Sequence, residues 1–329
     1  MVWSEIMEFF KTDKTFNFMG KRLPFLAISL ILFLASIGII FTKGLNFGID
    51  FAGGTLVQIK YDTKAPIDDI RNILKQKPEF ANASITEFGS DDEIVIRITA
   101  SSNSVTTDIS DEMHKILSAT GNFEIRRVDM VGPKVGDELR EKGFMALGLS
   151  FVMILIYVSF RFEYRFAVAS VFALIHDLVI AVGAISLFNI EVNLDILAAL
   201  LTLLGYSIND TIIVFDRIRE NVQNSKESLL EDIINDSVSR TLSRTTLTSL
   251  TTFFVVATLF VFGGEIIHGF AFTLVVGIIV GTYSSIFIAS AFLVQLKFSI
   301  EKYRSKEAEK LKRQKEKDKL RAMYEQGTI

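Results

Sequence analysis

The sequence predicts a polytopic α-helical membrane protein with six transmembrane helices and one small α+β domain between the first two. Half of the 329 residues are hydrophobic and the mean hydropathy is +0.38, whereas a soluble protein has about 45% apolar residues. The apolar residues gather in six runs, each near the roughly 20 residues of helix that cross a bilayer. About a hundred residues between the first two runs show a different pattern, which is typical of strands and amphipathic helices.

The expected membrane spans follow one another along the chain. They are residues 24–42, 143–160, 166–188, 194–215, 245–262 and 269–296. The first span follows Lys21 and Arg22 and has no small-residue cleavage site after a short apolar core. We therefore expect a retained signal anchor.

The orientation follows from the loops that keep Lys and Arg, which stay on the cytoplasmic side of a membrane. Basic residues occur beside the second–third connection and throughout 216–244, and the segment 297–329 carries 11 basic against 6 acidic residues. The connections 189–193 and 263–268 contain no Lys or Arg. We therefore expect residues 1–23, the loop 216–244 and the charged tail to be cytoplasmic. The segment 43–142 then faces the periplasm, and the protein lies in the inner (cytoplasmic) membrane.

The segment 43–142 has the pattern of a small folded domain. Strands are expected at 55–61, 84–88, 93–99 and 122–131, and helices at 65–76 and 106–119. The order β-α-β-β-α-β indicates a ferredoxin-like α+β sandwich.

The same segment carries no catalytic or metal-ligand spacing, and the chain has no cysteine for a disulfide or a thiolate site. We therefore expect a binding or lever domain and no enzyme. The stretch GLNFGIDFAGG (44–54) is rich in glycine but lacks the spacing of a phosphate loop. Gly53 and Gly54 are expected to allow a tight exit from the membrane, with Asp50 capping backbone amides.

The tail 302–326 is a run of charges. It is expected to be solvated or partly helical near anionic lipid, and contact with a ribosome or another cytoplasmic partner is an alternative.

The fourth span carries a carboxylate that lipid does not tolerate without a partner or a water-filled cavity. Asp210 lies about 10 Å inside the cytoplasmic edge at roughly 1.5 Å per residue, and Thr202, Tyr206 and Asn209 share nearly its face. Gly205 in this stripe would let another helix approach closely. Arg244, in the first turn of the fifth span, is the expected counter-charge. The pair is either a permanent ion pair that fixes packing or a switch that opens when Asp210 is protonated; the second alternative is our preferred interpretation.

The third span carries His176 and Asp177 near its middle. Adjacent helical residues point about 100° apart, so the two cannot face the same partner helix. His176 is expected to make a satisfied polar contact inside the bundle. Asp177 is either a functional carboxylate or an acceptor that holds the relay in place.

Several motifs in one order make the chain resemble the SecF family of bacterial protein-export subunits, relatives of the resistance-nodulation-division transporters. The matching stretches are FNFMGKR (16–22), GLNFGIDFAGGT (44–55), VGPKVGDELR (131–140), ALIHD (173–177), LGYSINDTIIVFDRIREN (204–221), LSRTTLTSLTT (242–252) and GTYSSIFIAS (281–290). The resemblance extends from about residue 9 to about residue 300.

The resemblance implies a function that composition does not reveal. SecF proteins pair with SecD beside the SecY-E-G channel, the SecA motor and the small subunit YajC, and use the proton gradient, with no cofactor, to complete late stages of preprotein translocation. It implies no nucleic acid as a partner. In the family, the residues matching Asp210 and Arg244 take part in proton coupling, and a further essential carboxylate belongs to SecD.

Two other functions and one other ion remain open. The chain could be a non-conducting scaffold that stabilises the translocase, although the pair of Asp210 and Arg244 argues against this. Half of a small-molecule or lipid exporter is a second alternative, but one insert of about a hundred residues leaves little room for its substrate clefts. Some relatives couple to sodium, and nothing in the sequence separates sodium from protons.

Overall fold

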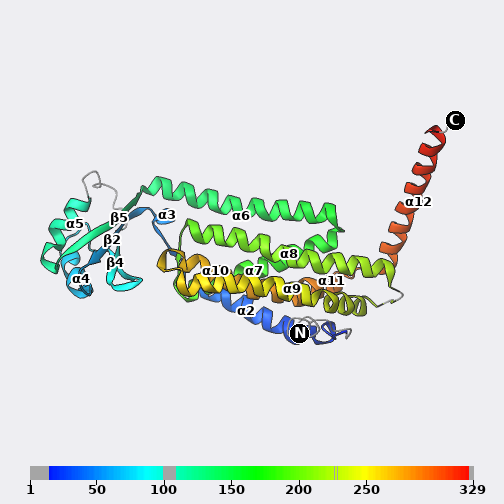
Figure 1. Ribbon diagram of the computed structural model, residues 1–329, viewed down its shortest axis with the longest axis horizontal. Helices are drawn as coiled ribbons and strands as arrows, with labels where there is room; N and C mark the ends of the chain where they lie inside the picture. The colour runs from blue at the N-terminus through cyan, green and yellow to red at the C-terminus, as the bar shows by residue number, and fades with distance from the viewer. Residues whose placement is uncertain (1–14, 99–108, 226, 228, 326–329) are drawn as a thin grey trace, which may run out of the picture.

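The protein is elongated, with long helices running side by side along its length (Figure 1). The computed structural model describes residues 15–98, 109–225, 227 and 229–325. A small domain built on a sheet lies at one end of the helical bundle, and helix α12 (Ile300–Glu325) leaves the other end at a steep angle.

Six helices of the described residues are long and apolar enough to cross a membrane, as predicted. They are α2 (Arg22–Lys43), α6 (Pro133–Arg161), α7 (Tyr164–Leu187), α8 (Leu194–Asn224), α9 (Leu230–Phe262) and α10 (Glu265–Ser284), which continues through the π-helical turn η3 (Ser285–Ala289) into α11 (Ser290–Gln295). A 3₁₀ turn, η1 (Met19–Lys21), precedes α2.

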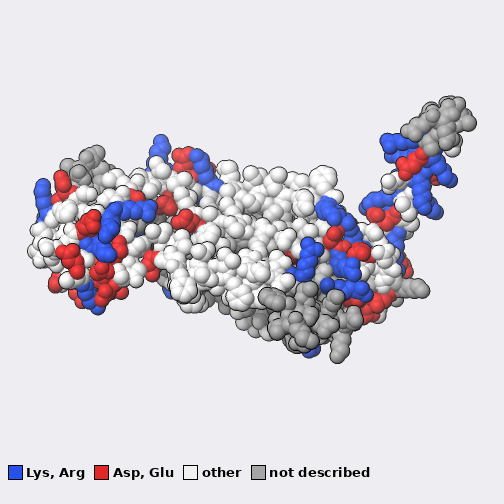
Figure 2. Space-filling view, viewed as in Figure 1, with Lys and Arg blue, Asp and Glu red and all other residues white. Residues whose placement is uncertain are grey.

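Charged side chains avoid the middle of the surface that Figure 2 shows. Figure 2 shows Lys, Arg, Asp and Glu at the two ends and on α12, with a band of other residues between them. Large apolar side chains such as Phe144, Met153 and Phe160 are exposed on α6, which would be unfavourable in water. A lipid bilayer or another membrane helix covers such a surface without this cost.

The expected loop 216–244 is mostly helical. Helix α8 continues to Asn224 and α9 begins at Leu230, so the break between them is short. The charged residues continue α8 because they pair along it: Arg219 with Asp216 at 3.0 Å and Arg217 with Glu220 at 2.7 Å. The apolar run of the fourth span ends at these charged residues, but the helix continues through them to Asn224.

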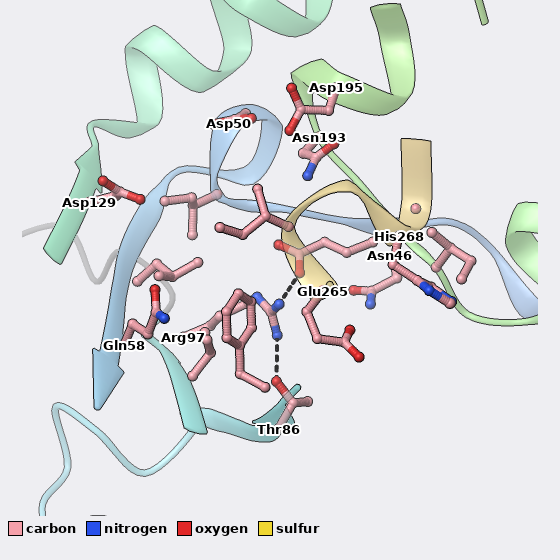
Figure 3. Close-up of a pocket in the computed structure, with 18 of the residues that line it drawn as sticks. Asn46, Asp50, Gln58, Thr86, Arg97, Asp129, Asn193, Asp195, Glu265 and His268 are labelled. Carbon is pink, nitrogen blue, oxygen red and sulfur yellow. Dashed lines mark hydrogen bonds and ion pairs between the residues drawn. The ribbon is translucent and has the colours of Figure 1, made fainter. Parts of the chain in front are cut away.

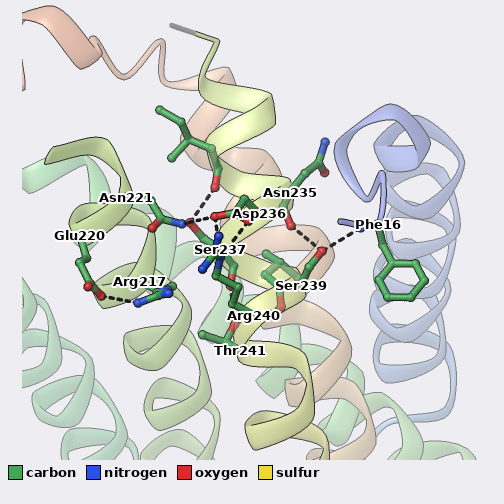
Figure 4. Close-up of polar contacts among 12 residues, drawn as sticks. Phe16, Arg217, Glu220, Asn221, Asn235, Asp236, Ser237, Ser239, Arg240 and Thr241 are labelled. Carbon is green, nitrogen blue, oxygen red and sulfur yellow. Dashed lines mark hydrogen bonds and ion pairs between the residues drawn. The ribbon is translucent and has the colours of Figure 1, made fainter. Parts of the chain in front are cut away.

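Side chains tie the extended ends of α8 and α9 together (Figure 4). The Asn221 amide on α8 donates to Asp236 Oδ2 at 2.9 Å and to Ser237 Oγ at 2.8 Å on α9. The backbone N–H of Phe16 donates to Ser239 Oγ at 2.9 Å, which attaches the segment before α2 to the same helix.

The second span likewise begins earlier than expected. Helix α6 starts at Pro133, a favoured residue in a first helical turn. Its first turns carry the ion pairs Arg140–Asp137 and Lys142–Glu138. Charged residues therefore extend this helix beyond its apolar run as well.

The predicted order of strands and helices in the inserted domain is confirmed. The elements are β2 (Gly54–Tyr61), α4 (Ile67–Lys75), β3 (Ser84–Phe88), β4 (Ser90–Ile98), α5 (Ile109–Leu117), the 3₁₀ turn η2 (Ser118–Thr120) and β5 (Phe123–Val131). The sheet order is β3-β4-β2-β5 with antiparallel neighbours, which is the ferredoxin-like arrangement. Alternate residues of β2 and β4, among them Val57, Ile59, Ile94 and Ile96, are buried in one core with α4 and α5. Residues 99 and 106–108 of the predicted elements lie outside the described residues.

A small second sheet joins this domain to the bundle. Strand β1 (Asn46–Phe47) pairs in parallel with β6 (Glu191–Val192), and the helical turn α3 (Ile49–Ala52) follows β1. The sequence had not indicated either element. Gly53 (φ 72°) and Gly54 (φ 140°) then turn the chain into β2 in conformations that disfavour other residues, and a Cβ at Gly54 would lie 2.5 Å from the Ile98 carbonyl oxygen. The two glycines therefore make a tight turn between α3 and β2.

Glycines let the membrane helices approach closely. A Cβ at Gly183 on α7 would lie 2.4 Å from the Ser36 Cβ on α2, and one at Gly281 on α10 would lie 3.1 Å from the Ser207 Cβ on α8. Small residues at such contacts increase the dispersion contacts between helices, which replace the hydrophobic effect inside lipid.

We predict that Gly183→Ala separates α2 from α7 and destabilises the protein by about 1–3 kcal/mol, the usual cost of overpacking. Gly38→Ala on α2 is the matched control, because a Cβ at Gly38 would meet no atom of another helix within 4 Å. The measurement is the temperature at which half of the detergent-solubilised protein is lost from the monodisperse peak. Equal midpoints for the two variants would contradict the close α2–α7 contact.

Candidate functional site

Polar side chains meet in the interior of the helical bundle around two aspartates. Asp177 on α7 and Asp210 on α8 are both fully buried. Five hydroxyl groups from α8, α9 and α10 are buried or half-buried in the same region. They belong to Ser207, Thr211, Ser249, Thr282 and Ser284.

Asp177 is held by hydrogen bonds from two neighbouring helices and by the adjacent His176. Its Oδ2 accepts hydrogen bonds from Ser207 Oγ on α8 at 2.6 Å and from Ser284 Oγ on α10 at 2.7 Å. Its Oδ1 lies 2.9 Å from His176 Nδ1, and the His176 ring stacks on Phe33 of α2 with 6.3 Å between centroids. The two adjacent residues thus reach different helices, as predicted, and also contact each other. The satisfied polar contact expected of His176 is only half made, because its buried Nε2 has no hydrogen-bond partner among the described residues. This network makes Asp177 a cross-link between helices.

Asp210 is buried with far fewer partners. Its Oδ2 accepts one hydrogen bond from Ser249 Oγ on α9 at 2.9 Å, and Thr282 Oγ1 on α10 lies 2.9 Å from the same Ser249 oxygen. Within the described residues, Asp210 Oδ1 has no hydrogen-bond partner, and the same holds for Tyr206 Oη and Thr211 Oγ1 on the same helix. An ionised carboxylate can accept about four hydrogen bonds, so this site supports the charge weakly.

The structure does not bring Arg244 to Asp210. Arg244 is exposed on α9, and no ion pair joins it to Asp210 in the part of the chain that the structure describes. It lies five residues before Ser249, roughly 7 Å along the helix axis at about 1.5 Å per residue. The serine hydroxyl occupies the position in which the arginine was expected. Arg240, one turn before Arg244 on α9, pairs with Asp236 at 2.8 Å.

The polar stripe predicted on α8 is open to the surroundings. Thr202, Gly205 and Asn209 are exposed, and Tyr206 is half-buried. A Cβ at Gly205 would meet no atom of another helix of this chain within 4 Å. The exposed residues Thr202, Gly205 and Asn209 therefore form an open surface, whereas Tyr206 packs against the core of the bundle and Asp210 is bonded to α9.

Sequence reasoning missed the serines and the threonine that hold the two aspartates. Ser249 lies in LSRTTLTSLTT and Thr282 and Ser284 lie in GTYSSIFIAS, two stretches that are rich in small hydroxyls inside apolar spans. Most hydroxyls of α9 bond the carbonyl one turn back, as Thr245 and Thr248 do. Only the packing of the helices distinguishes these from Ser249, which bonds across to α8. The π-helical turn after Ser284, a feature often found at functional sites, is likewise visible only in the structure.

A second polar site lies where the α+β domain meets the bundle (Figure 3). A cavity of about 730 Å³ separates the sheet from the loops before α8 and α10. Arg97 of β4 forms an ion pair with Glu191 of β6 and donates to Thr86 Oγ1 at 3.1 Å. Burial raises the pKa of the Glu191 carboxyl, Arg97 lowers it and Asp50 raises it further.

Asp50 caps a helix, as its sequence context predicts, but the helix is distant in sequence. Its Oδ2 accepts a hydrogen bond from the backbone N–H of Leu194 at 3.0 Å, the first residue of α8. Among the described residues, no three His, Cys, Asp or Glu side chains gather as metal ligands would.

Comparison with known proteins places the chain in a family. The pattern described as "Protein export membrane protein SecD/SecF, C-terminal" matches residues 112–299, and the "SecD/SecF GG Motif" matches residues 38–65. The protein translocase subunit SecF of Helicobacter pylori is 46% identical over 98% of this chain and 100% of its own length. That of Calditerrivibrio nitroreducens is 45% identical over 89% of this chain and 98% of its own length. This chain belongs to the SecF family.

Solved structures related to the SecF family share the fold. SecDF from Thermus thermophilus, described as a translocon-associated membrane protein, matches 87% of this chain with a TM-score of 0.79 and 37% sequence identity. SecDF in a "super-membrane-facing form" matches 91% with a TM-score of 0.66 and 36% identity. This chain spans 39% and 40% of those two chains. The six helices and the SecF relationship together identify a multi-pass protein of the inner membrane.

We predict that Asp177→Ala destabilises the protein, because the buried hydroxyls of Ser207 and Ser284 lose their shared acceptor. The expected cost is about 1–3 kcal/mol, measured as a fall in the thermal midpoint of the solubilised protein. Adding Ser207→Ala and Ser284→Ala to the Asp177→Ala variant should recover part of the loss, since the two hydroxyl groups that lost this acceptor are then removed. A triple variant less stable than the single one would show that these hydroxyls are not held mainly by Asp177.

Proposed function

We propose that the chain is an accessory subunit of the Sec translocase that works with SecD and uses the proton gradient to promote late stages of preprotein translocation. It performs no covalent catalysis and needs no cofactor. The observation that carries this proposal is Asp210: a fully buried carboxylate on a membrane helix that has a single hydrogen-bond donor among the described residues. Its membership of the SecF family and its likeness to SecDF support the role in protein export.

The proposed work of Asp210 is a change of charge. Burying an ionised carboxylate in the membrane is costly unless it is paired and hydrogen-bonded, and protonation removes the charge. Asp177 has enough donors to stay in one arrangement, whereas Asp210 has one donor and an unpartnered oxygen. Arg244 is proposed to approach Asp210 in another state of the cycle, when α9 moves relative to α8. His176 and Asp177 then support the relay by fixing the helices around it.

The proposed orientation places the helical end with α12 in the cytoplasm. Arg161, Arg165, Arg219 and Lys297 lie at this end, which agrees with the positive-inside tendency. Both termini are then cytoplasmic and the α+β domain is periplasmic, where it would meet the emerging preprotein. SecY-E-G, SecA and YajC are the further partners proposed.

The open stripe on α8 is the proposed contact with SecD. We predict that Gly205→Leu leaves this chain folded, because a Cβ there would meet no described atom of another helix within 4 Å, and reduces the amount of SecD that co-purifies. Gly148→Leu on α6 is the matched control, since a Cβ there would also meet no atom of another helix within 4 Å. Equal co-purification of SecD with both variants would place the SecD contact elsewhere.

The proton proposal is tested by preprotein translocation into inverted membrane vesicles that contain SecD and either the unaltered chain or Asp210→Asn. The amide keeps the size and the acceptor for Ser249 but cannot titrate. We expect the variant to assemble with SecD and to lose only the completion that depends on the gradient. Asp195→Asn, a change at an exposed carboxylate on the same helix, is the control.

Two results of the vesicle experiment would contradict parts of the proposal. Translocation at the unaltered level in Asp210→Asn would make Asp210 a packing residue and favour a scaffold. Dependence on a sodium gradient that persists after a proton uncoupler is added would replace the proton by sodium.

A further inference from the structure

The N-terminal end of α8, at Leu194, is called its outer end here. It is held in part by a residue of the segment that leads into the α+β domain. Asp50 of α3 accepts from the Leu194 N–H at 3.0 Å, and Asn193 Oδ1 accepts from the Ile196 N–H at 3.0 Å. Free N–H groups of a first helical turn need such acceptors. One of the two acceptors therefore comes from a segment 144 residues earlier in the chain.

The residues just before α8 are tied to the same segment and to the sheet. Glu191 lies opposite Asn46 in the β1–β6 pair, and the Gly48 N–H donates to the Val192 carbonyl at 2.8 Å. The Glu191 side chain forms the ion pair with Arg97 in β4, a central strand of the domain's sheet. Arg97 is the guanidinium that crosses from the sheet to the loop in Figure 3.

The ion pair of Arg97 and Glu191 crosses a cavity, so it is one of few contacts that can transmit a movement between the sheet and the bundle. The cavity of about 730 Å³ lies between the sheet and the bundle, so no continuous apolar core joins the two there. On the other side of the domain, β5 runs into α6 through Gly132, and a Cβ at Gly136 would lie 2.9 Å from the Gly53 nitrogen. The domain is thus attached closely to α6 and reaches α8 through a few polar contacts.

Helix α8 connects this junction to the buried carboxylate. It is continuous from Leu194 to Asn224, and Asp210 lies about 24 Å along its axis from Leu194 at roughly 1.5 Å per residue. A continuous helix moves as a rigid rod over this length, so a displacement at Asp210 reaches Leu194 and Glu191.

We propose that Asp50, Arg97 and Glu191 are positioning residues that make the α+β domain follow the outer end of α8. Through them a movement of the helix that carries Asp210 becomes a movement of the sheet. This inference rests on the proposed function for the work that such a movement performs. The existence of the link itself does not depend on which ion moves.

The link is tested first by a distance measurement without any gradient. The chain has no cysteine, so spin labels can be placed at Lys115→Cys on α5 and Ala198→Cys on α8, both exposed positions, in the full chain reconstituted with SecD. We expect a narrow distribution of label distances that becomes clearly wider in Arg97→Gln and in Asp50→Ala, which removes the acceptor for the Leu194 N–H. Arg71→Gln, which breaks an exposed ion pair with Asp68 on α4, is the control. An unchanged width in Arg97→Gln, or equal widening in Arg71→Gln, would overturn the proposal.

The second measurement is translocation into inverted vesicles by Arg97→Gln, Glu191→Gln and the exchanged pair Arg97→Glu with Glu191→Arg. We expect the single variants to lose most of the gradient-dependent completion and to keep the ATP-driven stage, and the exchanged pair to regain it. Widened distances with full gradient-dependent completion would show that the junction transmits no work and would overturn the proposal. If Asp210→Asn translocates normally, the ion relay is wrong, while the distance measurement still decides the link.

Discussion

Carboxylates buried among membrane helices must be held by polar groups from neighbouring helices, and this requirement organises the middle of the bundle. Lipid offers no hydrogen bonds, so each partner has to come from the protein. Asp177 meets the requirement with Ser207, Ser284 and His176, which join α7 to α8 and α10. The glycine at 281 belongs to the same arrangement, because it lets the Ser207 side chain sit between the helices. The close packing of the helices and the hydrogen bonds of Asp177 therefore require the same contacts between α7, α8 and α10.

The two aspartates differ in how completely this requirement is met. The oxygens of Asp177 are both engaged, whereas Asp210 depends on Ser249 alone in the described residues. A fully satisfied group favours one arrangement of the helices, and a partly satisfied one gains from a change in charge or position. This difference is the reason for the proposal that α7 has a fixed support role and that the contact between α8 and α9 is mobile. In this chain that contact lies between the two helices that carry Asp210 and Arg244.

Helix α8 is the element that joins the three parts of the molecule. Its N-terminal end is capped by Asp50 of α3, the helical turn that precedes the α+β domain, and its middle carries Asp210. Beyond the apolar run it is bound to α9 by Asn221 and to α12 by Arg304, which donates to the Val222 carbonyl at 2.6 Å and the Ser225 carbonyl at 2.8 Å. Its exposed stripe adds a surface on which a further helix can pack. One rigid helix thus contacts the domain, the buried carboxylate and the end of the bundle next to α12.

Local patterns alone determined the number of spans, the order of strands and helices in the domain, and the position of Asp177 and Asp210 inside apolar helices. These features depend on runs of apolar residues, on the alternation of apolar and polar residues in strands, and on charged residues inside apolar runs. All three can be seen in a single sequence. The partners of those residues depended on tertiary structure, because Ser249 and Thr245 are alike along the chain and differ only in which helix lies opposite. The same reason explains why Arg244 was expected where Ser249 lies, why 216–244 continues as helix, and why Asp50 caps a helix that begins at Leu194. Contacts between distant segments are set by how the helices cross, and no local pattern records that crossing.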